Sequence, residues 1–232
     1  IEQYAAERAD YIIATSEIVK NDLAVVGIAT EKIKVIHNAI EDYWFETPNV
    51  NLRNEPVLIF LGRIGEDPFT LKLKGVDRLI WLFERFPEVE KFSIVMSRNK
   101  KLVKWMKDNI PNHSMIVNAV KDNIPNLLTK YAGGIAVLTS RYEGFSLSLI
   151  EAMSQGLVPI SFSVGIAPEI IHDGENGFIV HSIEEAEEKI NLLLKDTALR
   201  HRLALVAKET AKQFKSDIMA EKVVNLYKNI LR

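Results

Sequence analysis

The stretch GIAVLTSRYEGFSLSLIEAM, residues 134–153, contains the two patterns that decide the fold of this chain. Its first five residues form a short apolar run, which is typical of a strand covered on both faces. Its last eight residues repeat apolar side chains at helical spacing, and Ser146 stands where an N-cap is expected. A strand, a loop and a helix are therefore predicted in direct succession.

The same alternation of short apolar runs and amphipathic stretches extends over the whole chain. Further strands are predicted at residues 11–14, 33–36, 57–61, 92–96, 115–117, 157–161 and 178–180. Helices are predicted at residues 17–26, 75–86, 100–109, 123–131, 146–155, 183–195, 197–214 and 217–231. Strands that alternate with helices indicate parallel βαβ units and a doubly wound, Rossmann-like α/β fold, which binds ligands outside the carboxyl ends of its strands.

Composition excludes several classes of protein. The chain has 47% hydrophobic and 26% charged residues, as in a globular protein. The 29 Lys and Arg against 31 Asp and Glu give no general reason to expect nucleic acid or an anionic membrane as a partner. Cysteine is absent, so disulfides and thiol chemistry are excluded and the cytoplasm is the expected location. The chain has no Asp-x-Asp motif and its five histidines are scattered, so no metal is expected.

The loop before the predicted helix at residues 146–155 has the features of an anion site. A glycine at position 144 would let the backbone turn closely, and free amides at a helix start attract an anion such as a diphosphate. A carboxylate at Glu143 would repel a phosphate unless it faced a sugar hydroxyl. Glu151 points back toward the helix start, where its two ionised oxygens could accept both hydroxyls of a ribose. Alternatively, both glutamates only complement the helix dipole. The amides in question belong to Gly144, Phe145, Ser146 and Leu147.

Residues 143–153, followed by residues 156–160, 165–171 and 173–178, resemble the signature region of the family 4 (group 1) retaining glycosyltransferases. These enzymes have the two-domain GT-B fold, and their pattern includes two glutamates with seven residues between them, as at Glu143 and Glu151. The resemblance implies that the chain is the C-terminal, donor-binding half of such an enzyme. It also implies that most of the acceptor domain is missing.

The resemblance continues upstream of the glutamate motif. Leu61-Gly62-Arg63 and Lys74-Gly75 look like the first donor-domain strand of the family and its phosphate-binding arginine and lysine. Together these two cations could replace a metal ion at a diphosphate. Arg63 could alternatively form an ordinary surface salt bridge. Residues 64–73 are an insert longer than the usual link, which leaves the position of Lys74 open.

Two further positions are compared with the family pattern. Val120 matches the position where the family lays its backbone against the base, or else it is ordinary packing at a strand end. Ser146 stands where the family often has glycine, and it is still expected to cap the helix.

The resemblance and a polar run at residues 46–56 predict how the chain is divided. Residues 1–46 are expected to be the tail of the acceptor domain and the linker, residues 47–215 the nucleotide-sugar donor-binding domain, and residues 216–232 a helix that packs back toward the acceptor domain. The first of these parts has too few strands to form a sheet alone.

The implied function is transfer of a hexose from a nucleotide diphosphate sugar to a hydroxyl acceptor with retention of configuration, in polysaccharide or glycoconjugate synthesis. A UDP-sugar is the favoured donor, without a metal or another cofactor. The acceptor would be a sugar or a lipid-linked sugar bound through the missing domain, and peripheral membrane association of the full protein is left open. The chain alone is expected to bind donor but to transfer poorly. The alternatives are a nucleotide-sugar epimerase and a non-catalytic module that binds nucleotide sugars.

Overall fold

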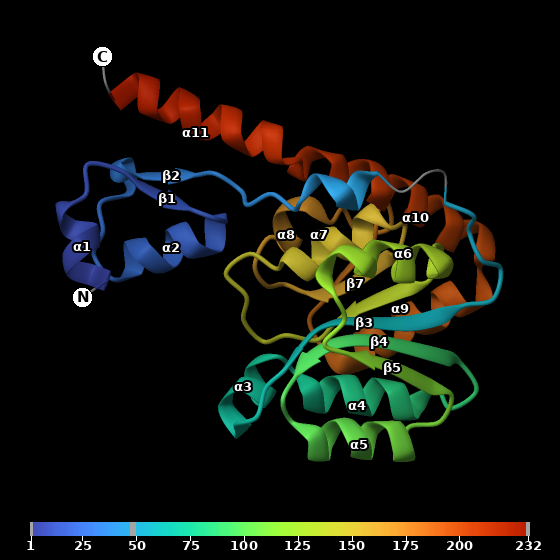
Figure 1. Cartoon of the computed structure of the whole chain (residues 1–232). Helices are drawn as coiled ribbons and strands as arrows, with labels where there is room; N and C mark the ends of the chain where they lie inside the picture. The colour runs from blue at the N-terminus through green and yellow to red at the C-terminus, as the bar shows by residue number, and fades with distance from the viewer. Residues whose placement is uncertain (1, 47–49, 231–232) are drawn as a thin grey trace.

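A computed structural model describes residues 2–46 and 50–230, in which two parallel sheets are flanked by helices (Figure 1). The strands are β1 (Ile12–Ala14), β2 (Ile33–Val35), β3 (Val57–Ile64), β4 (Glu90–Ser97), β5 (His113–Val117), β6 (Ile135–Leu138), β7 (Val158–Phe162) and β8 (Phe178–Val180). The α-helices are α1 (Glu2–Arg8), α2 (Glu17–Val25), α3 (Pro68–Leu73), α4 (Val76–Arg85), α5 (Lys100–Asn109), α6 (Ile124–Leu128), α7 (Leu147–Ser154), α8 (Ala167–Ile170), α9 (Ile183–Lys195), α10 (Thr197–Ala211) and α11 (Ser216–Ile230). Short 3₁₀ turns are η1 (Thr30–Lys32), η2 (Asp42–Phe45), η3 (Lys121–Asn123), η4 (Thr129–Tyr131) and η5 (Lys212–Phe214).

The larger sheet has the order β5-β4-β3-β6-β7-β8, and all its strands are parallel. The chain builds outward from β3 to β5, and then returns to the other side of β3 with β6. The order therefore reverses between β3 and β6, as in a dinucleotide-binding fold, and a crevice is expected at their carboxyl ends. The predicted doubly wound, Rossmann-like fold is confirmed.

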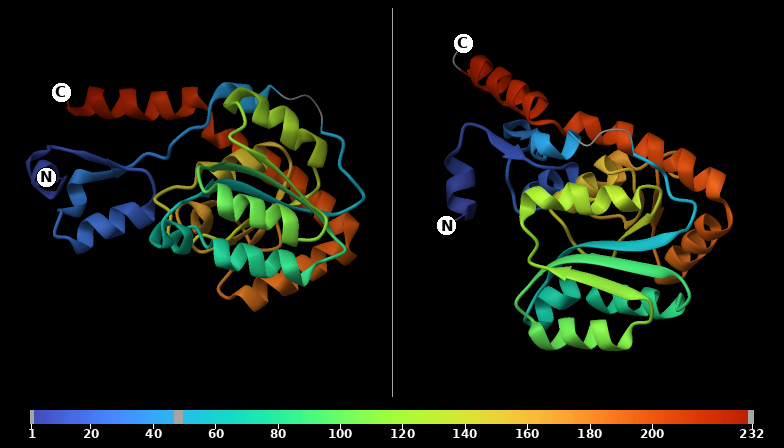
Figure 2. Two further views of the ribbon diagram at one scale, coloured as in Figure 1. Left: turned by 60° about the horizontal axis from the view of Figure 1, so that its bottom comes forward. Right: turned by 45° about the vertical axis from the view of Figure 1, so that its right-hand side comes forward.

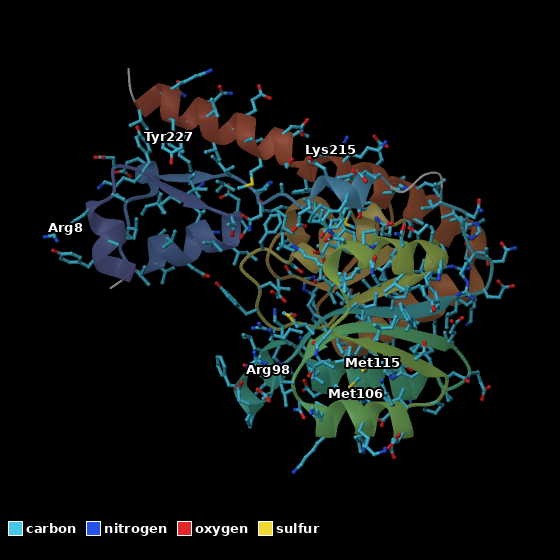
Figure 3. All side chains as sticks on the ribbon, in the orientation of Figure 1. Arg8, Arg98, Met106, Met115, Lys215 and Tyr227 are labelled. Atoms are coloured by element: carbon cyan, nitrogen blue, oxygen red, sulfur yellow. The ribbon has the colours of Figure 1, made fainter. Side chains whose placement is uncertain are left out.

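Apolar side chains alternate between the two faces of this sheet because successive strand residues point in opposite directions. Leu58 and Phe60 of β3 pack in one core cluster with α4, α5 and α9, whereas Val57 and Ile59 pack in the other with α7, α8 and η2. Figure 1 shows α4 and α5 below the sheet and α6, α7 and α8 above it. In Figure 3 Met106 of α5 and Met115 of β5 lie near each other, and both belong to the first cluster.

Residues 2–46 begin with a separate small unit. In it β1 and β2 pair in parallel and are connected through α2, and the core contains Ala14, Ile28 and Ile33. This unit lies beside the larger domain in all three views (Figures 1 and 2). The segment that leaves it packs on the larger domain, where Trp44 is fully buried and its carbonyl accepts a hydrogen bond from Gln155 Nε2 at 2.8 Å.

Part of the polar run predicted as a linker is held against the larger domain. Residues 47–49 lie outside the described residues. Further along, the Arg53 amide donates to Ala132 O at 2.8 Å, and its guanidinium is 2.9 Å from a carboxylate oxygen of Glu90. Arg200 is fully buried and donates to four backbone carbonyls, those of Gly133, Leu193, Arg53 and Asn54. Domain boundaries near residues 46 and 215 remain a prediction.

Helix α11 extends beyond the larger domain on the side of the N-terminal unit (Figures 1 and 2). None of its described residues is buried, and Val224, Tyr227 and Ile230 are exposed. Within residues 2–46 and 50–230, no helix is both long enough and apolar enough to cross a bilayer.

Candidate functional site

A cavity of about 1150 Å³ opens at the carboxyl ends of β3, β4 and β5, next to the start of α7. It exceeds the roughly 300–1000 Å³ of common small-molecule pockets, so it has room for a nucleotide sugar. Most of the predicted site residues line this cavity, namely Gly62, Arg63, Lys74, Glu143, Phe145, Ser146, Leu147 and Glu151. Two predicted residues, Gly144 and Val120, do not line it.

Arg63, the second-last residue of β3, lines the cavity. Its side chain is exposed, and it has no ion-pair partner among the described residues. The alternative of an ordinary surface salt bridge therefore finds no support in the described part of the chain. A guanidinium of this kind can bind two oxygens of a phosphate at once.

Lys74 reaches the cavity because the insert at residues 64–73 folds into the unexpected helix α3. Asp67 caps this helix by accepting from the Thr70 amide at 2.8 Å. Lys74 then stands between α3 and α4, followed by Gly75 at φ 61°. A Cβ at Gly75 would lie 1.8 Å from the carbonyl oxygen of Thr139, so only glycine permits α4 to begin so close to the end of β6.

Lys74 and Glu143 form an ion pair that the sequence did not indicate. The ammonium of Lys74 lies 2.8 and 2.9 Å from the two carboxylate oxygens of Glu143, and the Ser140 hydroxyl donates to the same carboxylate at 2.7 Å. Their side chains are 26% and 16% exposed, so both are partly shielded from solvent. The pair fixes the Glu143 carboxylate at the cavity wall through charge-assisted hydrogen bonds.

The start of α7 differs from the predicted capped helix. Ser146 occupies the N-cap position, but at φ 85° its backbone is left-handed and its hydroxyl makes no capping hydrogen bond. This conformation is costly for any residue except glycine. The prediction that Ser146 caps the helix is therefore wrong.

Close backbone packing at this loop depends on Gly165 rather than on Gly144. The Ile166 amide donates to Phe145 O at 2.8 Å, and a Cβ on Gly165 would lie 2.4 Å from that same oxygen. Gly144 has ordinary space for a Cβ, so the expected need for glycine there is not found. Its carbonyl instead accepts a 2.6 Å hydrogen bond from the Ser16 hydroxyl of the N-terminal unit.

Other contacts also join the N-terminal unit to this loop. The Tyr142 hydroxyl donates to Asp22 Oδ2 at 2.8 Å. Glu169 of α8 accepts from the Glu17 amide at 2.8 Å, and its other oxygen lies 3.0 Å from Nε2 of His37. The loop that bears Glu143 is therefore held on one side by the donor domain and on the other by residues 12–37.

Glu151 lies one turn into α7 and faces the cavity. Burial raises the pKa of its carboxyl to about 7, while the positive charge of Lys121 lowers it and the negative charge of Glu41 raises it. No hydrogen bond to this carboxylate is formed within the described residues. The expected ribose contact needs an ionised Glu151, whereas a pKa of about 7 leaves protonated and ionised forms in comparable amounts at neutral pH.

Val120 is 66% exposed and lies in a shallow neighbouring depression of about 400 Å³. Its role at the base remains a prediction. The next residue, Lys121, lines the main cavity.

Several cavity residues were not singled out from the sequence. Asn118, at φ 54°, accepts from the Ser97 amide and donates to the Ser97 carbonyl, both at 3.0 Å, which joins the ends of β4 and β5. Arg98 follows β4 and lies beside α3 in Figure 3. Asn38 enters from the segment after β2. Their positions directly after strands were a usable signal, because ligands bind at the carboxyl ends of parallel strands.

The described part of the chain contains no group of three or more His, Cys, Asp or Glu that could hold a metal ion. Independence of metal remains a prediction.

Residues 43–210 match the sequence pattern of the family described as glycosyl transferases group 1. The alpha-maltose-1-phosphate synthase of Mycolicibacterium smegmatis is 24% identical over 99% of this chain and 66% of its own length. The chain thus spans just under two thirds of that relative.

Solved structures share the fold. A sucrose-phosphate synthase from Thermosynechococcus elongatus superposes with a TM-score of 0.80 at 19% identity, over 99% of this chain and 60% of the other. HepE of Anabaena, in complex with UDP and glucose, superposes with a TM-score of 0.81 at 23% identity, over 98% of this chain and 66% of the other. At these identities the likeness concerns the fold alone.

Proposed function

The chain belongs to the group 1 glycosyltransferases, and on that premise we propose that it binds a nucleotide diphosphate sugar for retaining transfer of a hexose to a hydroxyl acceptor. The observation that carries this proposal is a cavity at the switch point of the sheet in which Arg63 and Lys74 lie together with the carboxylates of Glu143 and Glu151. Cations suit a diphosphate, and carboxylates suit the hydroxyls of a sugar and a ribose.

In the proposed reaction the bond between the anomeric carbon and the diphosphate oxygen breaks while the acceptor oxygen bonds to the same carbon from the same face. The acceptor proton passes to the departing phosphate oxygen. Arg63 and Lys74 stabilise the negative charge that grows on this oxygen, with help from the amides near the start of α7. The Lys74–Glu143 pair places the cation beside the carboxylate that holds the sugar. Glu151 holds the ribose.

The donor class has support from a structural neighbour, since HepE of Anabaena was solved with UDP and glucose. We therefore propose a UDP-sugar as donor, with no metal. Polysaccharide or glycoconjugate synthesis, a cytoplasmic location and an acceptor site on a preceding domain belong to the same proposal. Residues 1–46 would be the end of that domain, and residues 47–215 would be the donor domain. On this proposal, with the acceptor site on a preceding domain, residues 1–232 alone bind donor and transfer poorly.

Calorimetric titration with a panel of nucleotide sugars tests the proposal. The variant Lys74→Met removes one charge-assisted contact to the diphosphate and should weaken binding of a nucleotide diphosphate sugar about 10- to 100-fold, while binding of the bare nucleoside changes little. Lys72→Met is the matched control, because Lys72 is an exposed lysine on α3 that does not line the cavity. Equal affinity of Lys74→Met and wild type would overturn the assignment. Loss of binding in a chelator would overturn metal independence.

A further inference from the structure

Lys121, the first residue of η3, is a cation of the cavity that the proposed mechanism does not use. Its ammonium donates a hydrogen bond to Oε1 of Glu41. It also lines the main cavity together with Glu151. One lysine therefore binds a carboxylate from another part of the chain and shares the cavity with a second carboxylate, whose charge it influences.

Glu41 lies in a stretch of backbone that packs against the larger domain, and its side chain is 44% exposed. It precedes η2, where Trp44 is fully buried in the core cluster of α7 and α8. Immediately before it, the Ile40 amide donates to Phe214 O at 3.0 Å. The hydrogen bond to Glu41 raises the pKa of Lys121, so the lysine stays charged at neutral pH.

Glu151 has no such partner. Its carboxylate receives no hydrogen bond from the described residues. The charge of Lys121 lowers the pKa of Glu151 and so favours its ionised form. Glu41 acts in the opposite sense, because its negative charge disfavours a second carboxylate nearby. Tyr43 also interacts electrostatically with both Lys121 and Glu41, and the charge of Asp122 acts on Tyr43.

We propose that Lys121 is a positioning residue of the nucleotide site and that Glu41 and Glu151 compete for its ammonium. The Glu41–Lys121 pair then sets whether Glu151 carries the negative charge that binds ribose hydroxyls. An ionised carboxylate accepts two hydroxyl hydrogen bonds with charge assistance, and a protonated one does not. The ribose part of this inference rests on the proposed function; the charge coupling does not. Affinity for a ribonucleotide should rise with pH as Glu151 ionises.

The coupling is measured directly by carbon-13 NMR of the glutamate carboxyls, with the Glu151 signal assigned from Glu151→Gln. Glu41→Gln releases Lys121 toward Glu151, and the titration midpoint of Glu151 should fall by about half to one pH unit. Lys121→Met removes the cation, and the midpoint should rise by a similar amount. Exposed residues give matched controls, Glu46→Gln for the carboxylate and Lys130→Met for the lysine, and both should leave the midpoint unchanged.

Calorimetric titration of UDP from about pH 5.5 to about pH 8.5 then connects the coupling to binding. The pH at which affinity reaches half its maximum should follow the NMR midpoint in each variant. Unmoved midpoints in Glu41→Gln and Lys121→Met, with UDP still bound, would overturn this inference and leave the proposed function standing. Shifted midpoints without UDP binding at any pH would support the charge coupling and refute the proposed function.

Discussion

The carboxyl of Glu151 is predicted to make the free energy of unfolding depend on pH. Burial raises its pKa from the ordinary value of 4.5 to about 7, and the neighbouring charges of Lys121 and Glu41 partly oppose each other. In the unfolded chain the same group titrates near 4.5. Between these values the native state binds more protons than the unfolded state, so this group makes stability fall as the pH rises.

The size of the effect follows from the displaced pKa. A change from 4.5 to about 7 corresponds to roughly 3 kcal/mol at pH values above both. Glu151→Gln has nearly the same shape and carries no charge at any pH. The variant should match wild type near pH 4 and be more stable by roughly 3 kcal/mol near pH 8, in the absence of ligand.

Urea unfolding at a series of pH values, followed by tryptophan fluorescence, measures this difference. Other titrating groups such as His113 and Lys91 are present in both proteins, so their contributions cancel when the two curves are subtracted. Glu188→Gln on α9 is the control, because this glutamate is exposed, and its curve should run parallel to that of wild type. A stability difference between Glu151→Gln and wild type that is the same near pH 5 and near pH 8 would refute the reasoning.

Four further predictions concern stability. Ser146→Gly should raise the free energy of unfolding by about 0.5–1 kcal/mol, because glycine adopts the left-handed backbone without strain. Gly165→Ala should lower the free energy of unfolding by more than about 2 kcal/mol, because the new Cβ would lie 2.4 Å from a backbone oxygen. Urea unfolding in which Ser146→Gly is destabilised and Gly165→Ala is stabilised would contradict both. Arg200→Met should lower the free energy of unfolding by about 3–5 kcal/mol, because four backbone carbonyls lose their donor. Arg202 is exposed, so Arg202→Met should lower it by less than about 1 kcal/mol. Similar decreases in the two variants would be inconsistent with this account. Burial lowers the pKa of His113 to about 4, so this group should contribute a loss of roughly 3 kcal/mol as the pH falls from 6.5 to about 4, measured as the difference between wild type and His113→Gln. Parallel pH curves for the two proteins would argue against it.

Much of the fold could be predicted from the sequence because hydrophobic periodicity is a local property. All eight expected strands occur, and α9 spans the residues expected of it. The short elements α1, α3 and α8 were not expected. For α3 a signal existed, since Asp67 followed by Pro68 is a common helix start. The family resemblance was also within reach of the sequence, because its motifs lie in continuous segments.

The sequence by itself placed Arg63, Lys74, Glu143 and Glu151 after strands or at helix starts, and that was enough to expect them at one edge of the sheet. Only the tertiary structure decided what these groups do to one another. The ion pair of Lys74 with Glu143, and the coupling of Glu151 to Lys121, join positions that are far apart along the chain. The strength of an electrostatic interaction depends on the distance between the groups and on their burial in the folded state, and a local sequence pattern predicts neither.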